Sequence, residues 1–153
     1  MSINIVTAND KEFKEFTDGW SKHLEGINLP PDINTQIGTQ ILSDLDGAYA
    51  ILRIHYARIE AAKDKVDSII RQKERSMAEG SNEQNRRKNA TEYLENYPNG
   101  EGHTFDMYDY QRLVNRRFFM VKALIDVINN KQQRLITMTG LIKIDSSLGM
   151  GDV

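Results

Sequence analysis

The residues best suited to chemistry in this sequence are six cations on either side of Gly80. They are Arg71, Lys73, Arg75, Arg86, Arg87 and Lys88, and the stretch 71–88 holds only three acids. Lysine and arginine bind phosphate groups, and Tyr93 and Tyr97, a turn or two farther on, can stack on unpaired bases. The pattern favours a surface for single-stranded nucleic acid. A solvated face of mixed charge, tyrosines packed at a helix end and a contact with protein remain open alternatives.

Other kinds of site find little support. The three histidines, His23, His55 and His103, share no metal-ligand spacing, and we place His55 on the outer face of its helix. The chain has no cysteine. No serine or threonine has the partners of a catalytic triad, and the glycines of residues 99–102 lack the lysine of a phosphate loop and indicate a hairpin turn. We expect no enzyme, no metal and no cofactor.

Composition bounds the remaining classes. A chain of 153 residues forms one domain, and a net charge of −2 argues against a strongly basic nucleic-acid wrapper. The charge is uneven, because residues 1–50 hold three lysines against eight acids. No apolar run approaches the ~18 residues of a membrane span. We therefore expect a cytoplasmic protein that does not contact a membrane.

The elements that must position these residues are helical. In residues 1–28 we expect a short amphipathic helix that starts at Thr7, with the acid Asp10 three residues on, and that ends near Gly26. Its apolar edge is Phe13, Phe16, Trp20 and Leu24. We expect this edge to dock on the rest of the fold or on a neighbouring subunit.

A long heptad pattern follows the breaker at residues 29–32. Its positions are Leu42, Leu45, Tyr49, Leu52, Tyr56, Ile59, Lys63, Val66, Ile70, Lys73 and Met77. Spacings that alternate between three and four predict one helix from Thr35 to about Ala78, with Asp32, Asn34 or Thr35 as its cap. The polar residues 80–89 then predict a loop, and helical spacing returns briefly from Ala90 to Tyr97.

A turn at residues 97–102 precedes a second helix that Thr104 or Asp106 caps. Its heptad positions are Tyr110, Val114, Arg117, Val121, Leu124, Ile128, Lys131, Leu135, Met138 and Ile142. Two matched helices predict an all-α fold in which residues 29–145 form a long antiparallel helical hairpin, similar to a coiled coil, and residues 146–153 form a flexible tail.

The second long helix carries more apolar surface than two helices can cover. Phe118, Phe119 and Met120 widen it, and together with Phe13, Phe16 and Trp20 they form the predicted oligomer or partner interface. A second copy of the chain is the simplest cover, so we expect a homo-oligomer.

Two groups of residues resemble a known family. Arg58-Ile59-Glu60-Ala61, with Lys63 and Lys65, resembles the phage recombination mediators of the UvsY type. Residues 80–88, with Ala90 and Leu94, are similar to a polar, arginine-bearing connector of small helical phage proteins. The resemblance covers roughly residues 42–142, and the chain departs from it in its acidic N-terminal helix, its net negative charge, Asp64 and Asp67.

This resemblance implies a non-catalytic phage protein in the bacterial host cytoplasm. Such a protein forms oligomers, binds single-stranded DNA and helps to load a recombinase where a single-strand-binding protein would block it. The alternative is a structural or interaction protein, namely a virion component, scaffold or inhibitor. That protein would hold its partners through the apolar face around Phe118, Phe119 and Met120.

Overall fold

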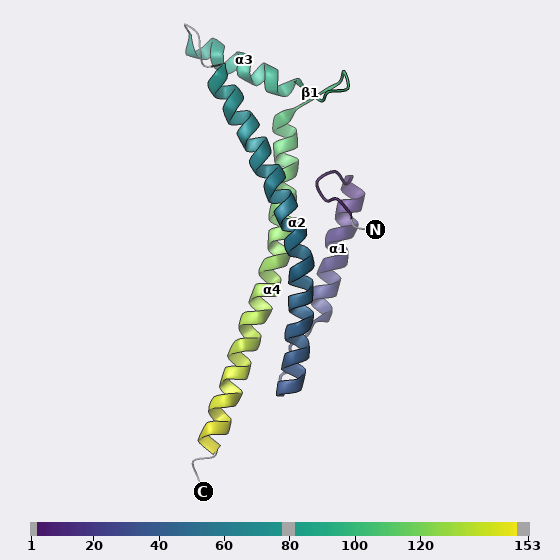
Figure 1. Ribbon diagram of the computed structural model, residues 1–153, viewed down its shortest axis with the longest axis vertical. Coiled ribbons are helices and arrows are strands. Elements are labelled where there is room, and N and C mark those ends of the chain that lie inside the picture. The colour runs from purple at the N-terminus through teal and green to yellow at the C-terminus, as the bar shows by residue number, and fades with distance from the viewer. Residues whose placement is uncertain (1–2, 78–81, 150–153) are drawn as a thin grey trace. The chain divides into compact units, whose positions relative to one another are not determined.

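A computed structural model describes residues 3–77 and 82–149, with side chains up to residue 140 (Figure 1). Its elements are α1 (Asp10–Gly26), α2 (Thr35–Ser76), α3 (Glu83–Glu95), β1 (Tyr97–Pro98), β2 (Thr104–Phe105) and α4 (Met107–Gly149). The two strands are two residues each. The predicted all-α class is confirmed, and the boundaries of α2 lie within two residues of those expected.

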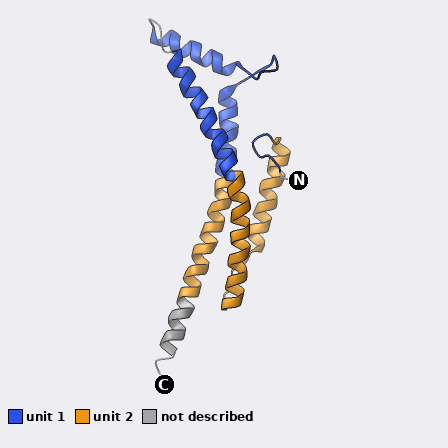
Figure 2. Cartoon of the chain, in the orientation of Figure 1, with its two compact units in different colours: residues 1–7, 56–119 blue, residues 8–55, 120–153 orange. Residues whose placement is uncertain are grey.

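The chain forms two compact units, shown in different colours in Figure 2. Unit 1 consists of residues 1–7 and 56–119, and unit 2 consists of residues 8–55 and 120–153. Helices α2 and α4 contribute one segment each to both units. Each unit therefore contains its own packing of an α2 segment on an α4 segment.

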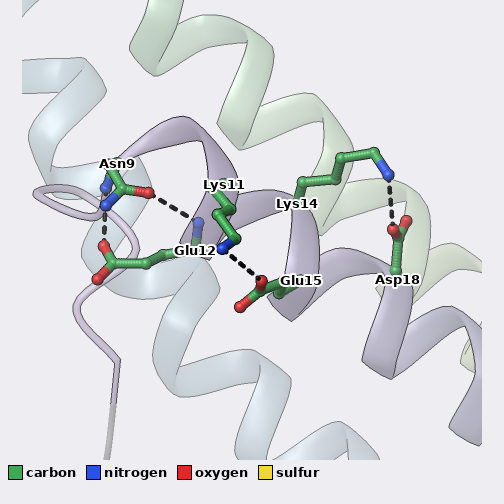
Figure 3. Close-up of polar contacts among 6 residues, drawn as sticks. All are labelled: Asn9, Lys11, Glu12, Lys14, Glu15 and Asp18. Atoms are coloured by element: carbon green, nitrogen blue, oxygen red, sulfur yellow. Dashed lines mark hydrogen bonds and ion pairs between the residues drawn. The ribbon is translucent and has the colours of Figure 1, made fainter.

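Helix α1 of unit 2 begins one residue after Asn9. The Asn9 side chain accepts a hydrogen bond from the backbone N–H of Glu12, and the Glu12 carboxylate accepts one from the N–H of Asn9, both at 2.9 Å (Figure 3). This reciprocal capping box satisfies two amides that would otherwise lack partners. The expected start at Thr7 was wrong, because Thr7 lies in a turn before the cap and the helix begins at Asp10.

The apolar edge of α1 packs inside unit 2. Phe13 and Leu24 are buried, and the ring of Phe16 lies 4.8 Å from the ring of His55 on α2. The expectation that His55 faces outward was wrong, because α1 covers that side of α2 and leaves His55 only 7% exposed. The aromatic edge thus docks on the chain's own fold, which was one of the two expected positions, the other being a neighbouring subunit.

A lysine on α4 fixes the end of α1. Lys131 Nζ donates hydrogen bonds to the carbonyl oxygens of Leu24 and Ile27, each at 2.6 Å. These carbonyls lie where the helix dipole is negative and intrahelical donors are missing, so a cation is favoured there. The heptad spacing places Lys131 on the apolar stripe, and no sequence signal indicates this contact.

The α2 and α4 segments of unit 2 run antiparallel. The Gln132 amide of α4 donates to Asp46 of α2 at 2.7 Å, and a Cβ at Gly38 would lie 3.6 Å from Thr139. The expected α4 positions from Val121 to Leu135 are buried or half-buried. On α2, however, Leu42 is 38% exposed and Ile41 takes the buried place, because α2 must also face α1.

The connection between the long helices in unit 1 differs from the expected polar loop. Residues 83–89 belong to α3, whose cap is Asn82, and residues 78–81 of this connection lie outside the described residues. The N–H of Gln84 donates to the Asn82 side chain at 3.0 Å. Pairs of opposite charge four residues apart also stabilise a helix that has no apolar stripe at its start.

The expected turn after α3 is confirmed. Gly100 and Gly102 have φ angles of 86° and 80°, which residues with a Cβ atom rarely adopt. The Asn99 side chain accepts hydrogen bonds from the N–H groups of Glu101 and His103. Asp106 caps α4 through the N–H of Tyr108, as one sequence alternative proposed. Helix α4 then continues past its expected end at Asp145, since no proline or glycine interrupts residues 146–148. The predicted flexible tail was therefore wrong for residues 146–149, and residues 150–153 lie outside the described residues.

A buried arginine holds the N-terminal segment in unit 1. Arg117 is 4% exposed, and its Nη1 donates to the carbonyl oxygens of Ile5 at 2.9 Å and Val6 at 3.3 Å. Residues 3–7 form no regular helix or strand, so these carbonyls depend on such a donor.

Replacement of Arg117 by methionine should therefore lower the free energy of unfolding by about 2 kcal/mol, because two backbone acceptors lose a charged donor. Urea denaturation measures this loss. The neighbouring Arg116 is exposed, and Arg116→Met serves as the matched control, with little expected change. Equal stability of the two variants would contradict the role given to Arg117.

Candidate nucleic-acid interface

The six cations predicted to bind phosphate, here called the tip cations, lie on the last turns of α2 and the first turns of α3. Their members are Arg71, Lys73, Arg75, Arg86, Arg87 and Lys88. Arg71, Arg75, Arg87 and Lys88 are exposed, and Lys73 and Arg86 are half-buried. The structure divides the six among three different surroundings.

Arg71 and Arg75 occupy one face of α2 beside carboxylates. They line a shallow hollow of about 350 Å³ together with Asp64 and Asp67. Asp67 is held by the Lys63 ammonium at 2.9 Å and by the Gln111 amide of α4 at 2.8 Å. The acids that depart from the basic pattern in the sequence thus lie beside the two arginines.

Arg86 and Arg87 border a second hollow, of about 530 Å³, which includes Glu74 of α2 and Glu83 of α3. Arg87 forms an ion pair with Glu83 at 2.7 Å, and Lys88 forms one with Glu92 at 3.8 Å. Such exposed pairs contribute ~0–1 kcal/mol and open readily when a phosphate competes. These cations remain accessible to an anionic ligand.

Lys73 and the two predicted stacking residues belong to an aromatic cluster. The Lys73 ammonium lies 4.1 Å from the centre of the Tyr93 ring, a cation–π contact. Tyr93 meets Tyr97 edge to face at 5.8 Å, and Tyr97 meets Phe105 at 5.6 Å. Both tyrosines pack on a core cluster that contains Ile70 and Leu94. Their placement matches the packing alternative, with each ring half-buried.

Two titratable side chains of unit 1 have shifted pKa values. The hydrogen bond from Gln111, followed by that from Lys63, lowers the pKa of the Asp67 carboxyl below its usual value. Burial, followed by the nearby charge of Glu74, raises the pKa of the Tyr108 hydroxyl. The Lys63 and Asp67 pair is visible in the sequence as an i,i+4 spacing, whereas no sequence signal links either residue to Gln111.

The predicted oligomer or partner interface is also divided. Phe13 is buried, and Phe16 and Trp20 are half-buried in unit 2. Phe118 is half-buried in unit 1, where its ring lies 5.2 Å from Tyr56 and 5.8 Å from the Lys63 ammonium. Phe119 is 60% exposed and Met120 is 36% exposed. Of the six residues, these last two offer the most surface to a partner.

Two further classes of site are absent from the described residues. In that part of the chain, no three histidine, aspartate or glutamate side chains are grouped so that they could hold a metal ion. None of its helices combines the length and apolar character needed to cross a lipid bilayer.

No family model matches the chain, and no curated protein or solved structure is significantly similar to it.

The lowered pKa of Asp67 makes a testable contribution to acid stability. Because the folded-state pKa lies below the unfolded one, the stabilisation is present above the unfolded pKa of 3.8 and is lost as the pH falls through the folded value. We expect Asp67→Asn to lower the free energy of unfolding by about 1 kcal/mol at neutral pH.

The difference in the free energy of unfolding between Asp67→Asn and the wild type should disappear in acid. Urea denaturation across the pH range measures it. The exposed Asp64 lies on the same helix, and Asp64→Asn is the matched control, with little expected change in the free energy of unfolding. A difference in the free energy of unfolding that stays the same from neutral pH through the acid range would contradict this assignment.

Proposed function

We propose that the chain is a non-enzymatic, self-associating helical protein that binds single-stranded DNA and assists recombinase loading, as an accessory factor of phage-type recombination in the host cytoplasm. One observation carries the DNA-binding part: Arg71, Arg75, Arg87 and Lys88 have exposed side chains on neighbouring stretches of α2 and α3. The resemblance of the sequence to recombination mediators of the UvsY type supports the biological role.

Phosphate contact is the principal interaction in this proposal. The exposed cations meet the DNA backbone, and their weak pairs with Glu83 and Glu92 are exchanged for phosphates. The Lys73 ammonium lies over the ring of Tyr93, and both tyrosine rings are half-buried in the aromatic cluster, so base stacking is secondary. A surface of this kind binds DNA without strong sequence preference.

The long helices are proposed to form one antiparallel hairpin. The support comes separately from each unit: Gln111 meets Asp67 in unit 1, and Gln132 meets Asp46 in unit 2. From Gln111 to Gln132 along α4, the partner on α2 moves back from Asp67 to Asp46, which is the order that antiparallel helices require. Copies of this hairpin then associate through the exposed apolar side chains around Phe119, which places several sets of cations along one strand of DNA.

Charge reversal tests the DNA-binding surface. We expect Arg87→Glu with Lys88→Glu to weaken binding of a labelled oligothymidylate by at least about tenfold at low salt, because two phosphate contacts become repulsive. Fluorescence anisotropy measures the dissociation constant. Arg71→Glu with Arg75→Glu should have a similar effect from α2.

A matched control lies on α1. Lys11 and Lys14 are exposed and pair four residues ahead with Glu15 and Asp18 (Figure 3), as Arg87 and Lys88 pair with nearby acids on α3. Lys11→Glu with Lys14→Glu should leave DNA affinity nearly unchanged, because the surrounding segment is acidic. Equal losses in the α1 and α3 variants, or no loss in either, would contradict the proposal.

The exposed apolar residues favour a second candidate function, that of an interaction protein. Phe119 stands with its ring 5.4 Å from that of Phe118 and with most of its surface in solvent. Exposed aromatic anchors are typical of protein interfaces. In this alternative the chain is a virion component, scaffold or inhibitor that holds its protein partners through this apolar face, and DNA is not bound.

Phe119→Asp tests self-association under both candidate functions. We expect the mass measured by light scattering to fall toward that of a single chain, because a buried interface cannot readily accept an unpaired carboxylate. Ile136 has a similar exposure of 61%, and Ile136→Asp is the control, with the assembled mass retained. An unchanged mass for Phe119→Asp would exclude this interface.

A further inference from the structure

An open groove of about 750 Å³ lies within unit 1, apart from the tip cations. Ala61 and Ala62 of α2 form part of its lining, with Tyr97 and Phe105 of the two-strand hairpin. Tyr110 of α4 and the N-terminal residue Val6 also line it. Its volume lies in the range of pockets that bind small molecules or side-chain anchors.

Small side chains leave this groove open. At positions 61 and 62 alanine provides only a methyl group, while the neighbouring lining residues Val66 and Ile69 are larger and apolar. The aromatic rings on the other side are fixed against one another, since Phe105 meets Tyr97 at 5.6 Å and Tyr110 at 5.8 Å. The groove therefore combines an aliphatic side with a rigid aromatic side.

Two cations border the groove without a compensating acid. Arg58 and Lys65 lie seven residues apart on α2, about 10 Å along the helix, and both are exposed. Among the described residues neither forms an ion pair, and no residue that lines the groove is acidic. The hollows beside Arg71 and Arg87, by contrast, each include two carboxylates.

The N-terminal wall of the groove is set by a buried side chain. Asn4 and Val6 line the groove, and the Arg117 guanidinium binds the carbonyl oxygen of Val6 at 3.3 Å. Arg117 is therefore a positioning residue for this wall. A rigid site of this kind requires little reordering when a ligand binds.

We propose that this groove binds a peptide segment of a partner protein in which acidic side chains flank an aliphatic or aromatic side chain. The apolar anchor enters between Ala61 and the aromatic side, and carboxylates of the peptide pair with Arg58 and Lys65. The mostly apolar lining, with two cations at its border, favours a peptide over a nucleic acid. This inference uses none of the tip cations and is independent of the proposed DNA binding.

Synthetic peptides with a fluorescent label test the proposal on the full chain. The probe is a short peptide that alternates glutamate with leucine and phenylalanine, and the reference peptides replace either glutamate by lysine or the apolar residues by serine. Fluorescence anisotropy should show binding of the probe and at least about tenfold weaker binding of both references, since each lacks one half of the complementarity.

Two variants then locate the binding site. Arg58→Glu with Lys65→Glu should weaken binding of the probe by at least about tenfold. Ala61→Phe should weaken this binding similarly, because the phenylalanine fills the groove although both cations are retained. The control is Lys122→Glu with Arg134→Glu, which reverses two exposed cations of α4 outside the groove lining. This control should bind the probe as the wild type does. Circular dichroism verifies that each variant remains helical.

Several results would overturn the proposal. These are no binding of the probe, equal binding of the lysine reference, and loss of affinity in the control variant equal to that in Arg58→Glu with Lys65→Glu. Displacement of the probe by oligothymidylate, with DNA binding lost in Ala61→Phe, would assign the groove to nucleic acid. Probe affinity that declines as the chain self-associates would assign it to a second copy. The DNA-binding proposal is judged separately by Arg87→Glu with Lys88→Glu.

Discussion

The fold depends on two cations of α4 that donate hydrogen bonds to backbone carbonyls of the N-terminal region. Within unit 1, Arg117 holds residues 5 and 6, and within unit 2, Lys131 holds the end of α1. Residues on a heptad stripe would ordinarily be apolar, and a cation that is buried there, as Arg117 is, or half-buried, as Lys131 is, requires strong acceptors. The carbonyls supply these acceptors, and the same contacts fix the N-terminal wall of the groove and the place of α1.

The distribution of charge separates two kinds of surface in unit 1. Around Arg71 and Arg87 the cations are accompanied by acids, so the local field is moderate and ligands must compete with weak ion pairs. Around Arg58 and Lys65 the lining holds no acid and is largely apolar. The first surface suits the repeated charges of a phosphate backbone, and the second suits an anchor side chain with flanking carboxylates.

Local sequence rules predicted the long helices well, because caps and heptad spacing act over a few residues. Asn34, Asp106 and the glycines of the turn were all recognisable. Apolar spacing alone missed the start of α3, where Asn82 and charge pairs stabilise a helix without an apolar stripe. Other features depend on contacts between distant segments, which the spacing of residues along the chain does not reveal. These features are the burial of Ile41 in place of Leu42, the burial of His55 and the assembly of the groove.

The central claim, that exposed lysines and arginines bind the backbone of single-stranded DNA, is tested most directly by the salt dependence of binding. The logarithm of the association constant of the wild-type chain for oligothymidylate, measured against the logarithm of salt concentration, should fall with a slope of about −3 if four phosphates are neutralised. A slope near zero would contradict the claim, because binding would then release no counterions.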